Sequence, residues 1–370
     1  MHCPQSVLRM YWPLAGETFL PSPPHNMGAV GLSAGHLHIH LDTRNFQAGD
    51  QLIGTVHLKL FQGVQARALC LLFDGKEHTE WETEGGRHKG GSHFVRQKFP
   101  IFIFSQGYLP PGDYSFPFAF VLPATLPGSF FLYETFLEAE IRYTLDALIE
   151  GSSARIEWSE VILHVSQLMT NPIYSLSGSA STRLASCCRD KGVVQIQIAF
   201  SKSAYVPGER AELIAEVNNS QSALDVAGFK VRLIRKVRLR SHGGHIHVRQ
   251  TEVCNWDILQ RVPRGEALLG EQSRHEILDI PDIMGGIEHS TTVHSEYLEC
   301  VYSITVHLKM AGVCQCVPTP EVQRPIVIYP RQLPPHLPPM MPQGWTPQVM
   351  PMAQFSVGQN YDYIPSPMPR

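Results

Sequence analysis

Short runs in which apolar and polar residues alternate dominate this chain. Residues 35–42 alternate strictly, and residues 51–61 and 138–149 repeat the same period of two. This period is typical of β-strands that bury one face. Residues 66–73 are almost wholly apolar, as expected for a strand in the middle of a sheet. Because no stretch shows a convincing helical period, the pattern predicts an all-β chain.

Turn residues divide the first half of the chain into short strands. The pairs at 85–86 and 90–91, both Gly-Gly, are expected to bracket a flexible hairpin tip. Pro117 interrupts the strand pattern over residues 114–122, which predicts an edge or bulged strand there. About seven short strands with frequent turn signals indicate a β-sandwich.

The second half of the chain repeats signatures of the first half at a constant offset. Phe46 and Gly49 open a corner that returns as Tyr205 and Gly208, 159 residues later in both cases (205 − 46 and 208 − 49). Tyr143 returns as Tyr302 at the same offset, and the Leu-Pro pair at 122–123 returns as Ile-Pro at 280–281. Self-similarity at this long period predicts two copies of one domain.

Changes in composition place the boundaries between the predicted units. We expect a disordered arm, a first sandwich, a linker, a second sandwich and a disordered tail rich in Pro and Met. Their ranges are 1–28, 29–167, 168–190, 191–330 and 331–370.

Size and composition fit this organisation. The 370 residues allow two domains of ordinary size, and the 43% hydrophobic content is enough to build two cores. A content of 29 Gly and 29 Pro with only 17% charged residues suits turn-rich β structure. The net charge of −3 gives no reason to expect nucleic acid as a partner.

Cysteine usage and terminal composition suggest a cytoplasmic setting. Eight cysteines without regular spacing argue against a disulfide framework and for a reducing compartment. The first 28 residues contain five prolines and lack the features of a signal peptide, and no apolar run reaches the roughly 20 residues of a transmembrane helix.

Histidines and cysteines supply candidates for metal chemistry, each with a simpler explanation. A strand over residues 36–40 would present His36, His38 and His40 on one face, a pattern that can bind zinc or be solvated. His242, His245 and His247 form a second cluster beside a Gly-Gly turn. Neither cluster has other ligands at convincing spacing. Cys187-Cys188 could be a lipid attachment site or a redox pair, and Cys314-x-Cys316 could contribute to a zinc site, but both pairs favour structural roles. We therefore predict no metal site and no cofactor.

Two motifs could bind partners. Asn171-Pro172-x-Tyr174 fits a turn that presents tyrosine to adaptor domains, although Asn-Pro alone also starts an ordinary turn. A basic run shares one parity, so its side chains would lie on one face of a strand and could meet phosphates, or form a solvated face balanced by acids. Its members are Lys230, Arg232, Lys236, Arg238 and Arg240.

Enzymatic signatures are missing from the sequence. It has no Gly-x-Ser-x-Gly elbow, no phosphate-binding glycine loop leading into a helix, and no recognisable catalytic carboxylate pair. We predict no catalytic residues and a protein that is not an enzyme.

The order of these features resembles the arrestin family, specifically the arrestin domain-containing proteins or α-arrestins. The likeness covers roughly residues 32–329. It is carried by Phe46, Gly49, Asp50, Leu52, Gly54, Val56, 109–116, 122–130, Asn171, Pro172, Cys187, Cys188, Gly192, Val194, 205–209, 217–220 and 325–328.

The resemblance implies two antiparallel, immunoglobulin-like β-sandwich domains in tandem. It also implies a cytosolic adaptor, at the plasma membrane or endosomes, that binds cargo tails of membrane proteins and links them to ubiquitin ligases or endocytic adaptors, with possible peripheral membrane contact. Many relatives dock ligases through Pro-Pro-x-Tyr motifs. The double prolines here, Pro334-Pro335 and Pro338-Pro339, lack the tyrosine. The alternative is a structural or ligand-binding β-sandwich scaffold without ubiquitin or endocytic links.

Overall fold

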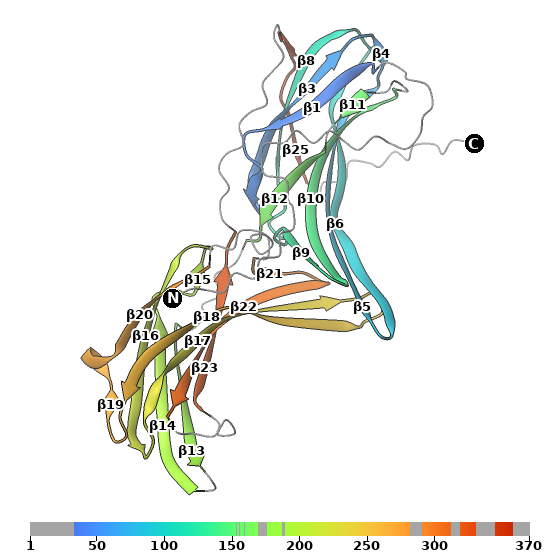
Figure 1. The fold of residues 1–370 in the computed structure, drawn as a ribbon. Helices are drawn as coiled ribbons and strands as arrows, with labels where there is room; N and C mark the ends of the chain where they lie inside the picture. The colour runs from blue at the N-terminus through green and yellow to red at the C-terminus, as the bar shows by residue number, and fades with distance from the viewer. Residues whose placement is uncertain are drawn as a thin grey trace.

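The computed structural model describes most of the chain as two β-rich units that lie end to end (Figure 1). The described residues are 33–152, 154, 156–158, 160–168, 176–186, 189–281, 291–311, 319–330 and 345–357. Apart from one short 3-10 turn, Gly270–Gln272, the regular elements in these ranges are all strands, in agreement with the predicted fold class.

The N-terminal unit is a sandwich of two sheets. One sheet has the order β11 (Ile156–Trp158), β1 (Gly35–Leu41), β3 (Gln51–Leu60), β8 (Gly112–Val121). The other has the order β2 (Asn45–Gln47), β12 (Val161–Ser166), β10 (Leu137–Glu150), β5 (Ala68–Thr83), β6 (Gly86–Ile103), with β9 (Phe130–Glu134) also on β10. A small ribbon joins β4 (Val64–Gln65) to β7 (Tyr108–Leu109).

The C-terminal unit repeats this plan. Its first sheet has the order β13 (Ser177–Ser186), β14 (Arg189–Phe200), β16 (Arg210–Ser222), β19 (Ala267–Leu268), with β20 (Arg274–Asp279) also on β16. Its second sheet has the order β15 (Ala204–Tyr205), β23 (Glu321–Ile328), β22 (Leu298–Met310), β17 (Val226–Arg240), β18 (Ile246–Val262), with β21 (Val293–His294) on β22.

The two corners that revealed the repeat have the same hydrogen bonds. In the first, Gly49 has φ 93° and the Asp50 carboxylate accepts from the Gln47 amide at 2.6 Å. In the second, Gly208 has φ 87° and the Glu209 carboxylate accepts from the Val206 amide at 2.7 Å. Each glycine is needed because other residues rarely adopt such a φ.

A further hydrogen bond near each corner occurs in both units. Leu122 donates its amide to the carbonyl of Asp50, and Ile280 donates to that of Glu209. These two residues belong to the Leu-Pro and Ile-Pro pairs recognised in the sequence. The constant offset therefore reflects a repeated three-dimensional unit.

Aromatic residues fill the core of the N-terminal sandwich. Phe120 of one sheet lies 5.6 Å from Phe73 and 5.7 Å from Phe99 of the other, between ring centroids. Tyr143, fully buried, stacks on Phe73 and donates its hydroxyl to the carbonyl of Pro127 at 2.8 Å. Burial of these large apolar side chains is the main force holding the two sheets together.

The predicted linker contains a strand. Residues 177–186 form β13, which pairs with β14 throughout its length. The expectation of an irregular segment over 168–190 is therefore wrong for these residues. Small polar side chains give no clear alternation in the sequence, but the backbone of β13 closes the open edge of the sheet.

The predicted disordered tail is also ordered in part. β24 (Gln348–Val349) and β25 (Ala353–Ser356) pair in parallel with β8, on either side of Pro117. Phe355 stacks on Phe99 and Phe120, at centroid distances of 4.1 and 5.2 Å. Composition alone suggested disorder over 331–370, whereas residues 345–357 gain both ladder hydrogen bonds and apolar burial at the edge of β8.

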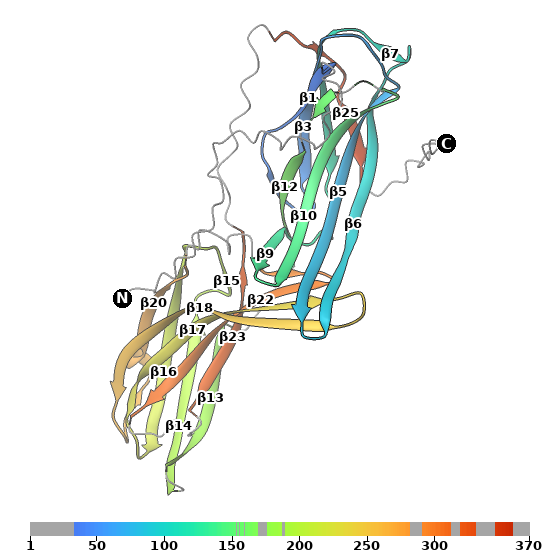
Figure 2. The ribbon, with the colours of Figure 1, turned by 45° about the vertical axis from the view of Figure 1, so that its right-hand side comes forward.

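Two long hairpins meet where the units join. The tip of the β5–β6 hairpin reaches the β17–β18 hairpin, which extends beneath it (Figure 2). Gly90 and Gly91 lie inside β6, so the expectation that they bracket the hairpin tip is wrong. A Cβ on Gly90 would lie 2.2 Å from the carbonyl oxygen of Arg240, and this close approach explains the glycine.

Candidate partner-binding surface

The basic run lies on one face of β17, as its parity predicts. Along this strand the buried residues Val231, Leu233, Val237 and Leu239 alternate with partly or fully exposed positions. The exposed positions carry the basic stripe, which we define as Lys230, Arg232, Lys236, Arg238 and Arg240. Between Leu233 and Ile234 the register shifts by one residue, and the extra residue belongs to the partner strand β18. The side chains of β17 therefore keep alternating between the two faces along the basic stripe.

Acidic neighbours neutralise part of the basic stripe. Arg232 pairs with Glu321 at 3.0 Å, and Arg238 lies 3.9 Å from Glu299. Within the described part of the chain, Lys230, Lys236 and Arg240 form no ion pair. These three cations are free to meet an anionic partner.

Arg238 and Arg240 also border a small cleft of about 120 Å³. Its other wall is the segment 294–299, which includes Tyr297 and Glu299. The volume is too small for a drug-sized ligand but could hold one side chain or one anionic group.

The opposite face of β17 holds a buried arginine that joins the two units. The Arg235 side chain is only 3% exposed, and its guanidinium lies 3.6 Å from the Glu134 carboxylate at the end of β9. Arg249 of β18 lies 3.5 Å from the same carboxylate. Glu134 thus bridges two cations of the C-terminal unit.

A second carboxylate from the N-terminal unit joins the units more tightly. Glu77 on β5 is 3% exposed. Its carboxylate accepts hydrogen bonds from Ser92 at 3.1 Å, from the Ser295 hydroxyl at 2.5 Å and from the Tyr297 amide at 3.3 Å. Burial raises the pKa of Glu77, whereas the hydrogen bonds lower it. Sequence reasoning missed this residue because a glutamate on an alternating strand looks like a solvent-exposed position.

The second histidine cluster also lies at this junction. His245 faces His88 of β6 at a centroid distance of 4.5 Å, and His247 lies 5.8 Å from Trp81. Burial lowers the pKa of His247. These imidazoles pack the two hairpins together. Among the described residues, no group of three or more His, Cys, Asp or Glu side chains is placed to hold a metal ion.

The first histidine cluster lies on the outer face of β1, as predicted. His40 faces His57 of β3 at 6.2 Å, and His57 accepts or donates a hydrogen bond with Ser115 at 2.9 Å. Burial, with a smaller contribution from nearby His40, lowers the pKa of His38 and brings that of His57 to about 4. The tail covers this face, since Trp345 lies 5.9 Å from His57.

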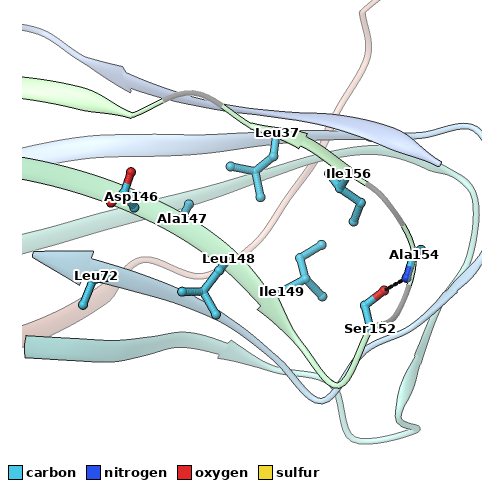
Figure 3. A pocket seen from close by; sticks show the side chains of 9 residues that line it. All are labelled: Leu37, Leu72, Asp146, Ala147, Leu148, Ile149, Ser152, Ala154 and Ile156. Carbon is cyan, nitrogen blue, oxygen red and sulfur yellow. Dashed lines mark hydrogen bonds between the residues drawn. The ribbon is translucent and has the colours of Figure 1, made fainter. Parts of the chain in front are cut away.

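The larger cavity lies at one side of the N-terminal sandwich, where β10 is no longer paired with β12 (Figure 3). Its volume is about 440 Å³, and Leu37, Leu148, Ile149 and Ile156 supply most of its apolar lining. Asp146 stands at its rim, with a pKa raised to about 6 by burial and by nearby carboxylates. Among its described lining residues the polar side chains are Asp146 and Ser152, and Ser152 accepts a hydrogen bond from the Ala154 amide at 3.2 Å.

Several predicted residues fall outside the described ranges. These are Asn171, Pro172, Tyr174, Cys187, Cys188, Cys314, Cys316, Pro334, Pro335, Pro338 and Pro339. Within the described ranges, no helix combines the length and apolar character needed to cross a bilayer.

Comparison with known proteins agrees with this architecture. Residues 37–170 match the model of the arrestin (or S-antigen) N-terminal domain, and residues 190–333 match that of the C-terminal domain. Curated relatives include arrestin domain-containing protein 17 of Caenorhabditis elegans, at 23% identity over 287 residues, and arrestin domain-containing protein 5 of Bos taurus, at 26% over 263 residues. The human arrestin domain-containing protein 1 is 26% identical over 207 residues.

These alignments cover 70%, 63% and 53% of the present chain, in the same order. The chain spans 65% of the nematode relative, 74% of the bovine one and 45% of the human one. Both arrestin domains are matched in their proper order, and each coincides with one sandwich. The chain therefore belongs to the arrestin family and is similar to its arrestin domain-containing members.

Proposed function

We propose that this protein is a non-enzymatic adaptor in membrane-protein trafficking, with the basic stripe on β17 as its cargo-binding surface. The observation that carries the proposal is the row of exposed cations on one sheet face. Three of them, Lys230, Lys236 and Arg240, lack an acidic partner among the described residues. Acidic or phosphorylated cytoplasmic tails of receptors and transporters have the complementary charge.

The proposal includes a role for the tail. Pro334, Pro335, Pro338 and Pro339 form two double prolines, a composition that favours the extended helix bound by SH3-type and WW-type domains. Because neither pair is followed by the tyrosine of a Pro-Pro-x-Tyr motif, a link to ubiquitin ligases would require another contact or another protein. The motif at Asn171, Pro172 and Tyr174 is a second candidate for recruiting endocytic adaptors.

The test is proximity labelling in living cells, with the wild-type protein compared with a variant in which Lys230, Lys236 and Arg240 are all replaced by Glu. We expect the wild-type protein to label membrane receptors or transporters and the variant to lose most of that set. A matched variant replaces three exposed cations elsewhere, Lys76, Arg96 and Arg189, by Glu. Equal labelling by all three proteins would exclude the basic stripe as the cargo surface, and a wild-type set without membrane proteins would exclude the trafficking role.

A further inference from the structure

The free edge of β18 lies beside the basic stripe. β18 is the last strand of its sheet, and its other side pairs with β17. The pairing is regular from Ile246 to Glu252, before a register shift at the next position. On the corresponding side of the N-terminal unit, β25 of the tail lies against β6, with Phe355 on Phe99. No described segment covers β18 in this way.

Hydrogen bonds at the hairpin tip show which backbone groups face outward. The Arg240 amide donates away from β18, to the carbonyl of Tyr297 at 2.8 Å, whereas the next amide, of Ser241, donates to the carbonyl of His245 at 2.9 Å. Successive residues of a strand direct their amides to opposite edges. Arg240 and its register partner Ile246 therefore direct their backbone groups away from each other.

The same alternation applies farther along the hairpin. Arg238 is opposite Val248, and Lys236 is opposite Gln250. The N–H and C=O groups of Ile246, Val248 and Gln250 consequently point out of the free edge. None of these amides has a backbone partner elsewhere in the described ranges. The edge offers three alternate residues whose backbone groups could pair with an added extended segment.

The side chains next to this edge define the chemistry of a fitting partner. Ile246 and Val248 are 51% and 49% exposed, on the same face as their register partners Arg240 and Arg238. Glu299 is the acidic partner of Arg238, and Lys236 and Arg240 have none in the described residues. Every second side chain of an added strand would lie on this face, beside Ile246 and Val248. Glutamate side chains at those positions would pack their methylene groups on the two aliphatic side chains and direct their carboxylates across β18 toward the cations of β17. The intervening apolar side chains would lie on the opposite face.

We propose that an extended acidic segment of a partner protein binds by adding a strand to β18 along residues 246–250. This inference deepens the proposed adaptor role by assigning a mode of binding to the distal half of the basic stripe. Its specificity comes from Lys236, Arg238 and Arg240, and the backbone of Ile246, Val248 and Gln250 supplies the hydrogen bonds.

The experiment measures fluorescence anisotropy of a labelled nine-residue peptide in which Glu and Val alternate. We expect saturable binding to the full-length protein. A peptide of the same sequence with every internal amide N-methylated, which cannot complete a ladder in either strand direction, should bind at least tenfold more weakly. A peptide in which Lys replaces Glu should also lose binding, because its charge is wrong.

Substitution of Val248 provides a matched pair. V248P removes an outward amide without breaking the ladder to β17, because proline is tolerated on edge strands. V248P should weaken peptide binding about tenfold, and V248T, which keeps the amide, should stay within about threefold of the wild-type protein. Equal binding of the N-methylated and unmodified peptides would overturn the proposal even if V248P failed to fold. The proposal would also be overturned if two copies of the protein paired through β18 and the peptide did not disrupt these dimers.

The two proposals can fail separately. If V248P keeps both peptide binding and cellular labelling while the triple Glu variant loses labelling, the basic stripe remains the cargo surface and strand addition is excluded. If the peptide binds by the expected rules but the cellular labelling contains no membrane proteins, the edge site stands and the trafficking role falls.

Discussion

Single residues in this protein carry more of the contact between the units than their sequence context suggests. Glu77 accepts three hydrogen bonds, two of them from the C-terminal unit. Gly90 permits β6 to pass within van der Waals range of the Arg240 carbonyl. The sequence suggested an ordinary solvent-exposed position for Glu77 and a hairpin tip for Gly90. Their roles depend on a surface that is more than 140 residues away in sequence, and local patterns contain no information about it.

At the scale of single residues, we predict that the titration of Glu77 makes the stability of the protein depend on pH. Because burial raises its pKa in the folded protein, the folded state takes up a proton at a higher pH than the unfolded chain does. The stability contributed by protonation is present below the unfolded pKa and is lost as the pH rises through the folded pKa. A Gln at this position cannot titrate. Its amide oxygen can accept from Ser295 and Tyr297, and its NH2 group can donate to the Ser92 hydroxyl.

The measurement is urea unfolding of the wild-type and E77Q proteins between about pH 4 and pH 7.5, around the ordinary glutamate pKa. We expect the wild-type protein to gain stability relative to E77Q as the pH falls. E82Q, at an exposed position of the same strand, serves as the control and should follow the wild-type curve. A difference between wild type and E77Q that does not change with pH would contradict the prediction.

At the scale of elements, the main strands could be predicted from the sequence. The strands that only extend an existing sheet edge could not. β1, β3 and β10 lie within one residue of the expected ranges because each buries one face against its own unit. β13, β24 and β25 were missed. Each of the three is stabilised by backbone pairing with an existing sheet edge. Such pairing requires less apolar/polar alternation in the sequence than a strand with one buried face does.

At the scale of elements, we predict that the tail strands β24 and β25 stabilise β8. Phe355→Ala removes a half-buried ring from its stack on Phe99 and Phe120, so we expect a loss of about 1–3 kcal/mol in unfolding free energy, below the cost for a fully buried ring. Amide hydrogen exchange of the part of β8 paired with β25 should accelerate. Ser356→Ala, at an exposed position of the same strand, is the control. Unchanged exchange in β8 after deletion of residues 345–370 would show that the tail strands do not protect it.

At the scale of the whole molecule, the two sandwiches are held by charged and polar groups on crossing hairpins. Glu134 reaches Arg235 and Arg249, Thr79 donates to the Arg240 carbonyl at 2.9 Å, and His242 donates its amide to the Lys89 carbonyl at 2.9 Å. Interfaces of this polar kind between domains are compatible with relative motion.

At the scale of the whole molecule, we predict that Glu134→Ala loosens the contact between the two units. The substitution leaves the buried Arg235 without its carboxylate, and we expect a loss of about 1–3 kcal/mol in unfolding free energy. Small-angle X-ray scattering should show a larger radius of gyration as the units separate. Glu138→Ala, on the neighbouring strand and in no described ion pair, is the control. A radius and a stability equal to those of the wild-type protein would mean that Glu134 does not hold the units together.

The pattern along the chain was enough to establish the main strands, the duplication and the outward face of the basic stripe. Apolar alternation, turn glycines and strand parity are local properties, and the repeated corners at Gly49 and Gly208 need only their own neighbours to form. Tertiary structure alone decided how the stripe is neutralised, which edge stays open beside it, and that Glu77 and Glu134 join the two units. These features arise when strands distant in sequence come into contact, and the energy of a buried charge or an unpaired edge depends on what the rest of the fold places next to it.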